Sequence, residues 1–149
     1  MTRRVGNAQL FVGEPGIGKS RLLDETRSLA NRRQFAVAGA VAVEGSPPLW
    51  PLRQALRAIV QLRHARETVI EDVLGVQGLT DPVATALLRA EQIAGLLSAS
   101  LSPSPLLIWF DDLHEADDAT LRTLDCLVQA CRDAPIMWLR ILYSPVILR

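Results

Sequence analysis

The eight residues Gly13 to Ser20, GEPGIGKS, decide the fold expected for this chain. Their spacing, G-x-x-x-x-G-K-[ST], is typical of a loop that wraps around the phosphates of a nucleotide. Glycines let the backbone approach a phosphate without a Cβ in the way, and the loop N–H groups then point inward. A glycine-rich turn between a strand and a helix is the alternative interpretation of the same residues.

The residues of this loop have distinct expected roles. Lys19 is expected to reach the β- and γ-phosphates and to take part in catalysis, and the Ser20 hydroxyl is expected to ligate Mg²⁺. Lys19 is the only lysine among 16 basic residues, which favours a role for its compact charge on a phosphate. The predicted cofactor-binding set is Gly13, Glu14, Pro15, Gly16, Ile17, Gly18, Lys19, Ser20 and Arg21.

The sequence on either side supplies the context that this loop needs. The apolar run from Ala8 to Val12 predicts a short buried strand that stops at a glycine. After the loop, Leu22, Leu23, Thr26, Leu29 and Ala30 recur at helical spacing and predict a helix from about Lys19 to Arg33. Strand, loop and helix therefore follow one another in the required order.

A second group of polar residues follows the most hydrophobic strand candidate, Leu106 to Phe110. This strand continues into Asp111 and Asp112, and carboxylates at the carboxyl end of a strand lie where open α/β sheets bind ligands. Asp111 is predicted to hold Mg²⁺ together with Ser20, directly or through a water. Asp112 is a candidate for orienting or deprotonating the attacking water. A turn-forming Asp-Asp pair is the alternative.

The remaining elements are predicted from periodicity and from helix start signals. Trp50 lies at a helix start, where it is either a packing anchor or a neighbour of the nucleotide. Because it is rich in alanine, the second strand candidate is also compatible with a helix. The predicted elements are a strand from Phe35 to Val43, a helix opened by Trp50 and Pro51, a weaker helix between Arg66 and Gly78, a helix from Asp81 and Pro82 with the stripe Val83, Leu87, Ala90, Ala94, Leu97 and Leu101, a helix capped by Asp117 or Asp118 that ends near Pro135, and a strand from Ile136 to Tyr143.

Composition narrows the class of protein. The chain has 149 residues, 49% of them hydrophobic, and a formal net charge of zero, as expected for one globular domain over residues 1–149. Zero net charge does not favour direct nucleic-acid binding. No apolar run approaches a membrane span, and no signal peptide opens the chain. Cys126 and Cys131 point to different faces of a predicted helix and are expected to stay unpaired, which favours a cytoplasmic protein.

With these motifs in place, the chain resembles the ATPase domain of large P-loop regulators, the AAA-like or STAND-type modules of long LuxR-family transcriptional regulators. The matching stretches are GEPGIGKSRLLDE at 13–25, GSPPLWPLRQALR at 45–57 and PLLIWFDDLHEADDATLRTL at 105–124. The resemblance implies a three-layer α/β P-loop NTPase fold of the additional-strand type, a parallel sheet flanked by helices in the order 5-1-4-3-2. It also implies a Mg²⁺ carboxylate at the end of strand 3, and ATP as the nucleotide.

The chain also departs from that family. Only seven residues precede the first strand, Glu115 stands where the family has tryptophan, and Ser144 stands where it tends to place an arginine. The fold is expected to be incomplete at the C-terminus, without strand 5 and the lid, and an exposed edge at strand 1 favours self-association or contact with regulatory domains. The leading hypothesis is an ATP- and Mg²⁺-binding switch with slow or no hydrolysis. A competent ATP hydrolase and a non-binding relic that serves as an interaction surface are the alternatives.

Overall fold

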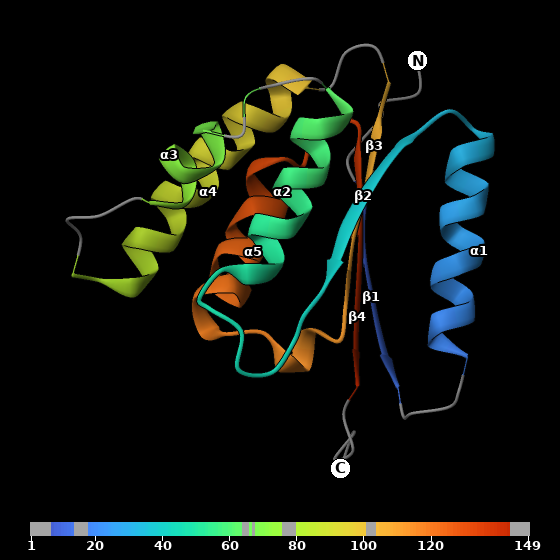
Figure 1. Cartoon of the computed structure of the whole chain (residues 1–149), viewed down its shortest axis with the longest axis horizontal. Coiled ribbons are helices and arrows are strands. Elements are labelled where there is room, and N and C mark those ends of the chain that lie inside the picture. The colour runs from blue at the N-terminus through green and yellow to red at the C-terminus, as the bar shows by residue number, and fades with distance from the viewer. Residues whose placement is uncertain are drawn as a thin grey trace.

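The computed structural model describes residues 7–13, 18–63, 66, 68–75, 80–100 and 104–143. Within them, four parallel strands form one sheet between a layer that contains only helix α1 and a layer that contains the other α-helices (Figure 1). The elements in chain order are β1 (Asn7–Gly13), α1 (Lys19–Arg32), β2 (Ala36–Val41), α2 (Trp50–Leu62), α3 (Thr68–Leu74), α4 (Pro82–Ser100), β3 (Leu106–Asp111), the 3₁₀ helix η1 (Leu113–Glu115), α5 (Asp118–Ala130) and β4 (Ile136–Tyr143). This confirms the predicted parallel α/β class.

The sheet has the order β1-β4-β3-β2. The last strand in the sequence therefore lies between the first and the third, as in the order 1-4-3-2 that the resemblance implies. Gly13 in β1 is paired with Tyr143 in β4, and Phe110 in β3 is paired with Arg140 in β4. Because every pair is parallel, all four strands end at the same edge of the sheet.

Strand β3 supplies both faces of the core, because successive side chains of a strand point to opposite sides. On one side Leu106, Ile108 and Phe110 are buried with residues from α2 to α5. On the other side Leu107 joins the smaller cluster beneath α1, together with Leu23 of that helix. Burial on both faces accounts for the continuous apolar run that predicted this strand.

Trp109 lies on the α1 side of β3 and contacts residues of two neighbouring elements. The guanidinium carbon of Arg27 on α1 lies 4.9 Å from the centroid of a Trp109 ring, a cation–π contact. On the adjacent strand, Gly39 is paired with Trp109, and a Cβ built on Gly39 would lie 2.3 Å from its indole. The missing side chain of Gly39 is therefore what makes room for the indole.

The helix from Pro82 is present, but part of its predicted apolar stripe is wrong. Ala90 and Leu97 are fully buried as expected, whereas Val83 and Leu87 are 62% and 50% exposed. The buried face instead includes Ala86 and Ile93. Because α4 carries apolar residues on more than one side, periodicity alone left its rotation ambiguous. Leu101, the last predicted member, lies outside the described residues.

Three smaller predictions are also tested by the structure. The segment from Phe35 to Val43 forms a strand, Ala36–Val41, and not a helix. Cys126 and Cys131 are both free thiols, as predicted. None of the helices described is long and apolar enough to cross a membrane.

The packing of Trp109 against Gly39 predicts opposite effects for two Gly→Ala substitutions. Gly39→Ala drives a methyl group into the indole and is expected to lower the free energy of unfolding by about 2–3 kcal/mol. In the matched control, Gly95→Ala adds a methyl group in open space within α4 and is expected to raise it by about 0.5–1 kcal/mol. Urea denaturation of both variants measures the difference, and a Gly39→Ala protein as stable as the parent would contradict this packing.

Candidate functional site

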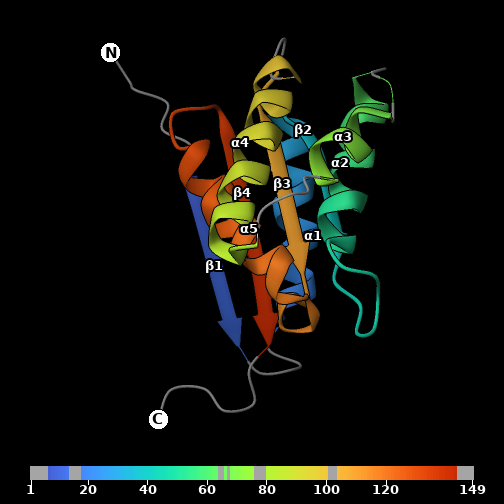
Figure 2. The same ribbon diagram turned by 90° about the vertical axis from the view of Figure 1, so that its left-hand side faces the viewer.

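The predicted site residues that the structure describes lie at the carboxyl edge of the sheet, where β1, β4 and β3 end together (Figure 2). Gly13 is the last residue of β1 and Asp111 is the last residue of β3. Only β4 separates these two strands, so their backbones are roughly 10 Å apart where they are level. A metal ion between a phosphate loop and a carboxylate requires this common edge.

Helix α1 begins at this edge with its backbone donors exposed. Gly18, the N-cap residue, has φ +87°, a left-handed conformation that favours glycine, and its carbonyl accepts the first helical bond from Leu22 N at 2.9 Å. Among the described residues no side chain caps the helix, and its first turn contains no acidic residue. The first amides of a helix have no partner within it, so this N-terminus suits an anion.

The phosphate loop itself is only partly described. Residues 14–17, which include four of the predicted cofactor-binding positions, lie outside the described residues. Lys19 is the first residue of α1, and Ser20 lies exposed in the same turn. The exposed Arg21 donates to the Glu25 carboxylate at 3.1 Å, one helical turn along α1. The roles of these residues in binding stay predictions.

Asp111 and Asp112 differ in backbone conformation, because Asp111 ends strand β3 whereas Asp112 forms the turn that follows it. The alternation along β3 places Asp111 on the α1 side of the sheet, the side of Trp109, and its Oδ1 accepts from Asp112 N at 2.8 Å. Asp112 has φ +53°, a left-handed conformation that aspartate tolerates, and it turns the chain from β3 into η1. The structure therefore gives Asp112 a role in the turn, and its predicted role as a base stays a prediction.

The donor atoms at this edge fit Mg²⁺. Ser20 offers a hydroxyl and Asp111 a carboxylate, the hard oxygen ligands that Mg²⁺ prefers. Among the described residues no three His, Cys, Asp or Glu side chains gather as a metal site. Mg²⁺ bound through one carboxylate, waters and a nucleotide phosphate needs no such cluster. The oxygens of Ser20 and Asp111 would hold this ion.

The loop after Asp112 is fastened by Asp117, and sequence reasoning predicted only half of its role. As expected of an N-cap, its carboxylate accepts from Thr120 N at 3.1 Å, and it also accepts from the Thr120 hydroxyl at 2.5 Å. The same carboxylate accepts from the backbone N–H of Leu49 at 3.2 and 3.3 Å. Leu49 is buried with φ +64°, a rare conformation for a bulky residue, so Asp117 secures the strained start of α2.

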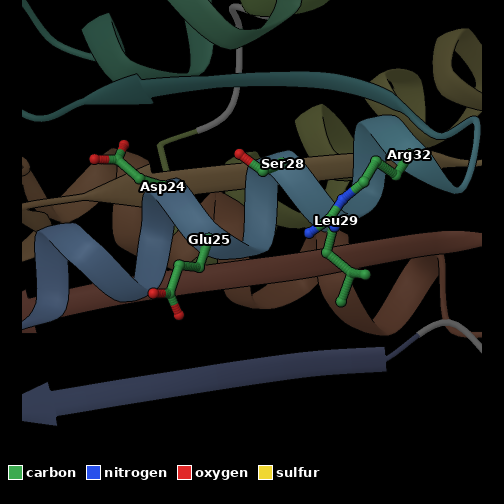
Figure 3. A pocket seen from close by; sticks show the side chains of 5 residues that line it. All are labelled: Asp24, Glu25, Ser28, Leu29 and Arg32. Carbon is green, nitrogen blue, oxygen red and sulfur yellow. The ribbon is translucent and has the colours of Figure 1, made fainter.

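A hollow of about 480 Å³ on α1 lies away from this edge of the sheet. It is lined by Asp24, Glu25, Ser28, Leu29 and Arg32. In Figure 3, Glu25 and Leu29 point toward the side of β1, whereas Asp24 and Ser28 lie on the opposite flank of the helix. Because these side chains do not converge, we assign no ligand to the hollow.

Comparison with known proteins gives one family. The family model described as AAA ATPase domain matches residues 2–139, which include both the loop after β1 and the end of β3. No curated protein matches the chain.

The bonds to Asp117 predict that this carboxylate stabilises the fold. Asp117→Ala removes a helix cap and the acceptor for Leu49 N, and it is expected to lower the free energy of unfolding by about 2–3 kcal/mol. The neighbouring Asp118 is exposed, and Asp118→Ala is expected to cost less than about 1 kcal/mol through the helix dipole. Urea denaturation compares the two variants, and equal losses would refute the special role of Asp117.

Proposed function

Because the chain belongs to the AAA ATPase domain family, we propose that it binds ATP with Mg²⁺ at the carboxyl edge of the sheet and acts as a nucleotide switch. The observation that carries the proposal is the arrangement of two elements. The uncapped N-terminus of α1 and the carboxylate-bearing end of β3 lie at one edge, separated by a single strand. This arrangement suits a triphosphate bound at the helix and a metal ion bound beside it.

The proposed roles follow from the chemistry of each group. The loop from Gly13 to Gly18 and the first amides of α1 bind the phosphates, and Lys19 neutralises the β- and γ-phosphates. Ser20 and Asp111 hold the ion, which supplies positive charge to the phosphate oxygens.

We further propose that hydrolysis by this segment is slow or absent. Phosphoryl transfer is accelerated mainly by positioned positive charge and by an oriented water. The sequence has Ser144 after Tyr143, where an arginine would add such charge. Arg140, the arginine of β4, donates instead to Asp125 of α5 at 2.8 Å. Asp112 is the remaining candidate for orienting the water.

The finer assignment is that of a cytoplasmic regulator of the LuxR type. Three sequence stretches that span α1, the start of α2 and the β3–α5 segment support it. In such a protein the nucleotide-bound state would be read by neighbouring domains, and this segment would not itself contact nucleic acid.

Substitution of Lys19 tests binding. Lys19→Ala removes the charge proposed to lie at the phosphates and is expected to weaken ATP–Mg²⁺ binding by roughly 10- to 100-fold, as a lost charged hydrogen bond would. The matched control is Arg32→Ala, which removes an exposed cation from the other end of α1 and should leave affinity unchanged. Isothermal titration measures both. Absence of any binding heat in the parent protein would favour the relic hypothesis.

Substitution of Asp111 tests the metal site separately. Asp111→Asn retains size but loses charge, and it is expected to reduce the gain in ATP affinity that Mg²⁺ provides while leaving binding in EDTA unchanged. Phosphate release from ATP, measured on the parent protein, distinguishes a switch from a hydrolase. A steady turnover that disappears in Asp111→Asn would establish the hydrolase and overturn the proposal of a slow switch.

A further inference from the structure

A second hollow, of about 440 Å³, lies between the beginnings of α4 and α5. Helix α4 leads toward the start of β3 and α5 follows its end, so both helices begin near the carboxyl edge of the sheet and run side by side (Figure 2). The positive ends of both helix dipoles therefore lie near the hollow, each capped by a carboxylate, Asp81 for α4 and Asp117 for α5. It is lined by Thr80, Pro82, Thr85, Arg89, Asp118, Ala119 and Arg122.

Arg89 is the unusual member of this lining. The residue is only 8% exposed, and its Nη1 donates to the Thr123 hydroxyl at 3.1 Å. Its Nε is buried without a hydrogen-bond partner, and within the described part of the chain its guanidinium makes no ion pair. A buried cation with unused donors is costly, because it has lost water without gaining a partner.

The charged groups around Arg89 do not supply the missing hydrogen-bond partner. The carboxylate of Asp117 favours the charged guanidinium, but its oxygens already accept hydrogen bonds from Leu49 and Thr120. Burial lowers the pKa of the Arg89 guanidinium, and Asp117 offsets only part of that effect. On the rim, the exposed Arg122 adds a positive charge and the exposed Asp118 a negative one.

We propose that this hollow is a binding site for a single oxyanion group, a phosphate or a carboxylate carried by a small molecule. The oxyanion pairs with the guanidinium of Arg89, and the exposed Arg122 adds attraction. The Thr80 side chain on the lining offers a further hydroxyl group. The lining comes from α4, α5 and Thr80 just before α4, and it includes no residue of the proposed nucleotide site, so the two proposals are independent.

The test uses the full chain with Lys19→Ala, so that phosphate binding at the start of α1 is weakened. The readout is the Nε–Hε resonance of Arg89 in ¹H–¹⁵N spectra, assigned by its loss in Arg89→Lys. Inorganic phosphate and acetate are titrated separately at constant ionic strength. We expect a saturable shift with at least one of them, and the comparison tells which oxyanion the site takes.

Three variants of exposed residues test whether the anion binds at this hollow. Arg122→Gln is expected to lower the affinity for the titrated anion at least threefold. Asp118→Asn removes the opposing charge and is expected to raise that affinity at least threefold. Arg132→Gln removes a similarly exposed arginine just beyond the end of α5 and should change nothing. An Arg89 resonance unmoved by both anions would overturn the proposal. So would equal weakening by Arg122→Gln and Arg132→Gln, because that pattern indicates general charge screening.

Discussion

The structure depends above all on the hydrogen-bonded register that holds β1, β4 and β3 in parallel. Gly13 lies opposite Tyr143, and Phe110 lies opposite Arg140, so the loop after β1 and the carboxylate after β3 emerge at one edge. A slip of one residue would turn Asp111 to the other face of the sheet, away from α1. The buried side chains of β3 prevent such a slip, because Leu106 and Ile108 face one cluster and Leu107 faces the other.

Electrostatics at this edge follow from the same topology. Each helix that follows a strand of a parallel sheet begins near the carboxyl ends of the strands, so α1, α2, α4 and α5 present their positive ends there. Carboxylates cap two of these four helices, Asp81 before α4 and Asp117 before α5, through bonds to Val83 N and Thr120 N. Neither Gly18 before α1 nor Leu49 before α2 supplies a side-chain cap, but Leu49 is buried whereas Gly18 is exposed. The start of α1 is therefore both uncapped and exposed, as a ligand-binding helix end requires.

Much of this arrangement was predictable from the sequence, and the failures have physical causes. The strand Leu106–Asp111 and the helix start at Lys19 carried strong local signals, an apolar run and a glycine-rich loop. The exposed Leu87 was misassigned because α4 is apolar on several sides. The bond from Leu49 to Asp117 joins residues 68 positions apart, and no local pattern reports such a contact. Arg89 was missed for the same reason, since only the packing of α4 on α5 buries it.

The unequal covering of the two faces of the sheet sets which part of the molecule opens first. Among the described residues, five buried side chains hold α1 on its face, whereas the opposite face is held by a much larger cluster. Detachment of α1 alone therefore exposes less apolar surface than detachment of the helix layer on the opposite face, and it costs less free energy. Its amides would exchange with deuterium earlier than those of α5. Any nucleotide that spans α1 and β3 would suppress this motion and convert the loosest layer into a rigid one.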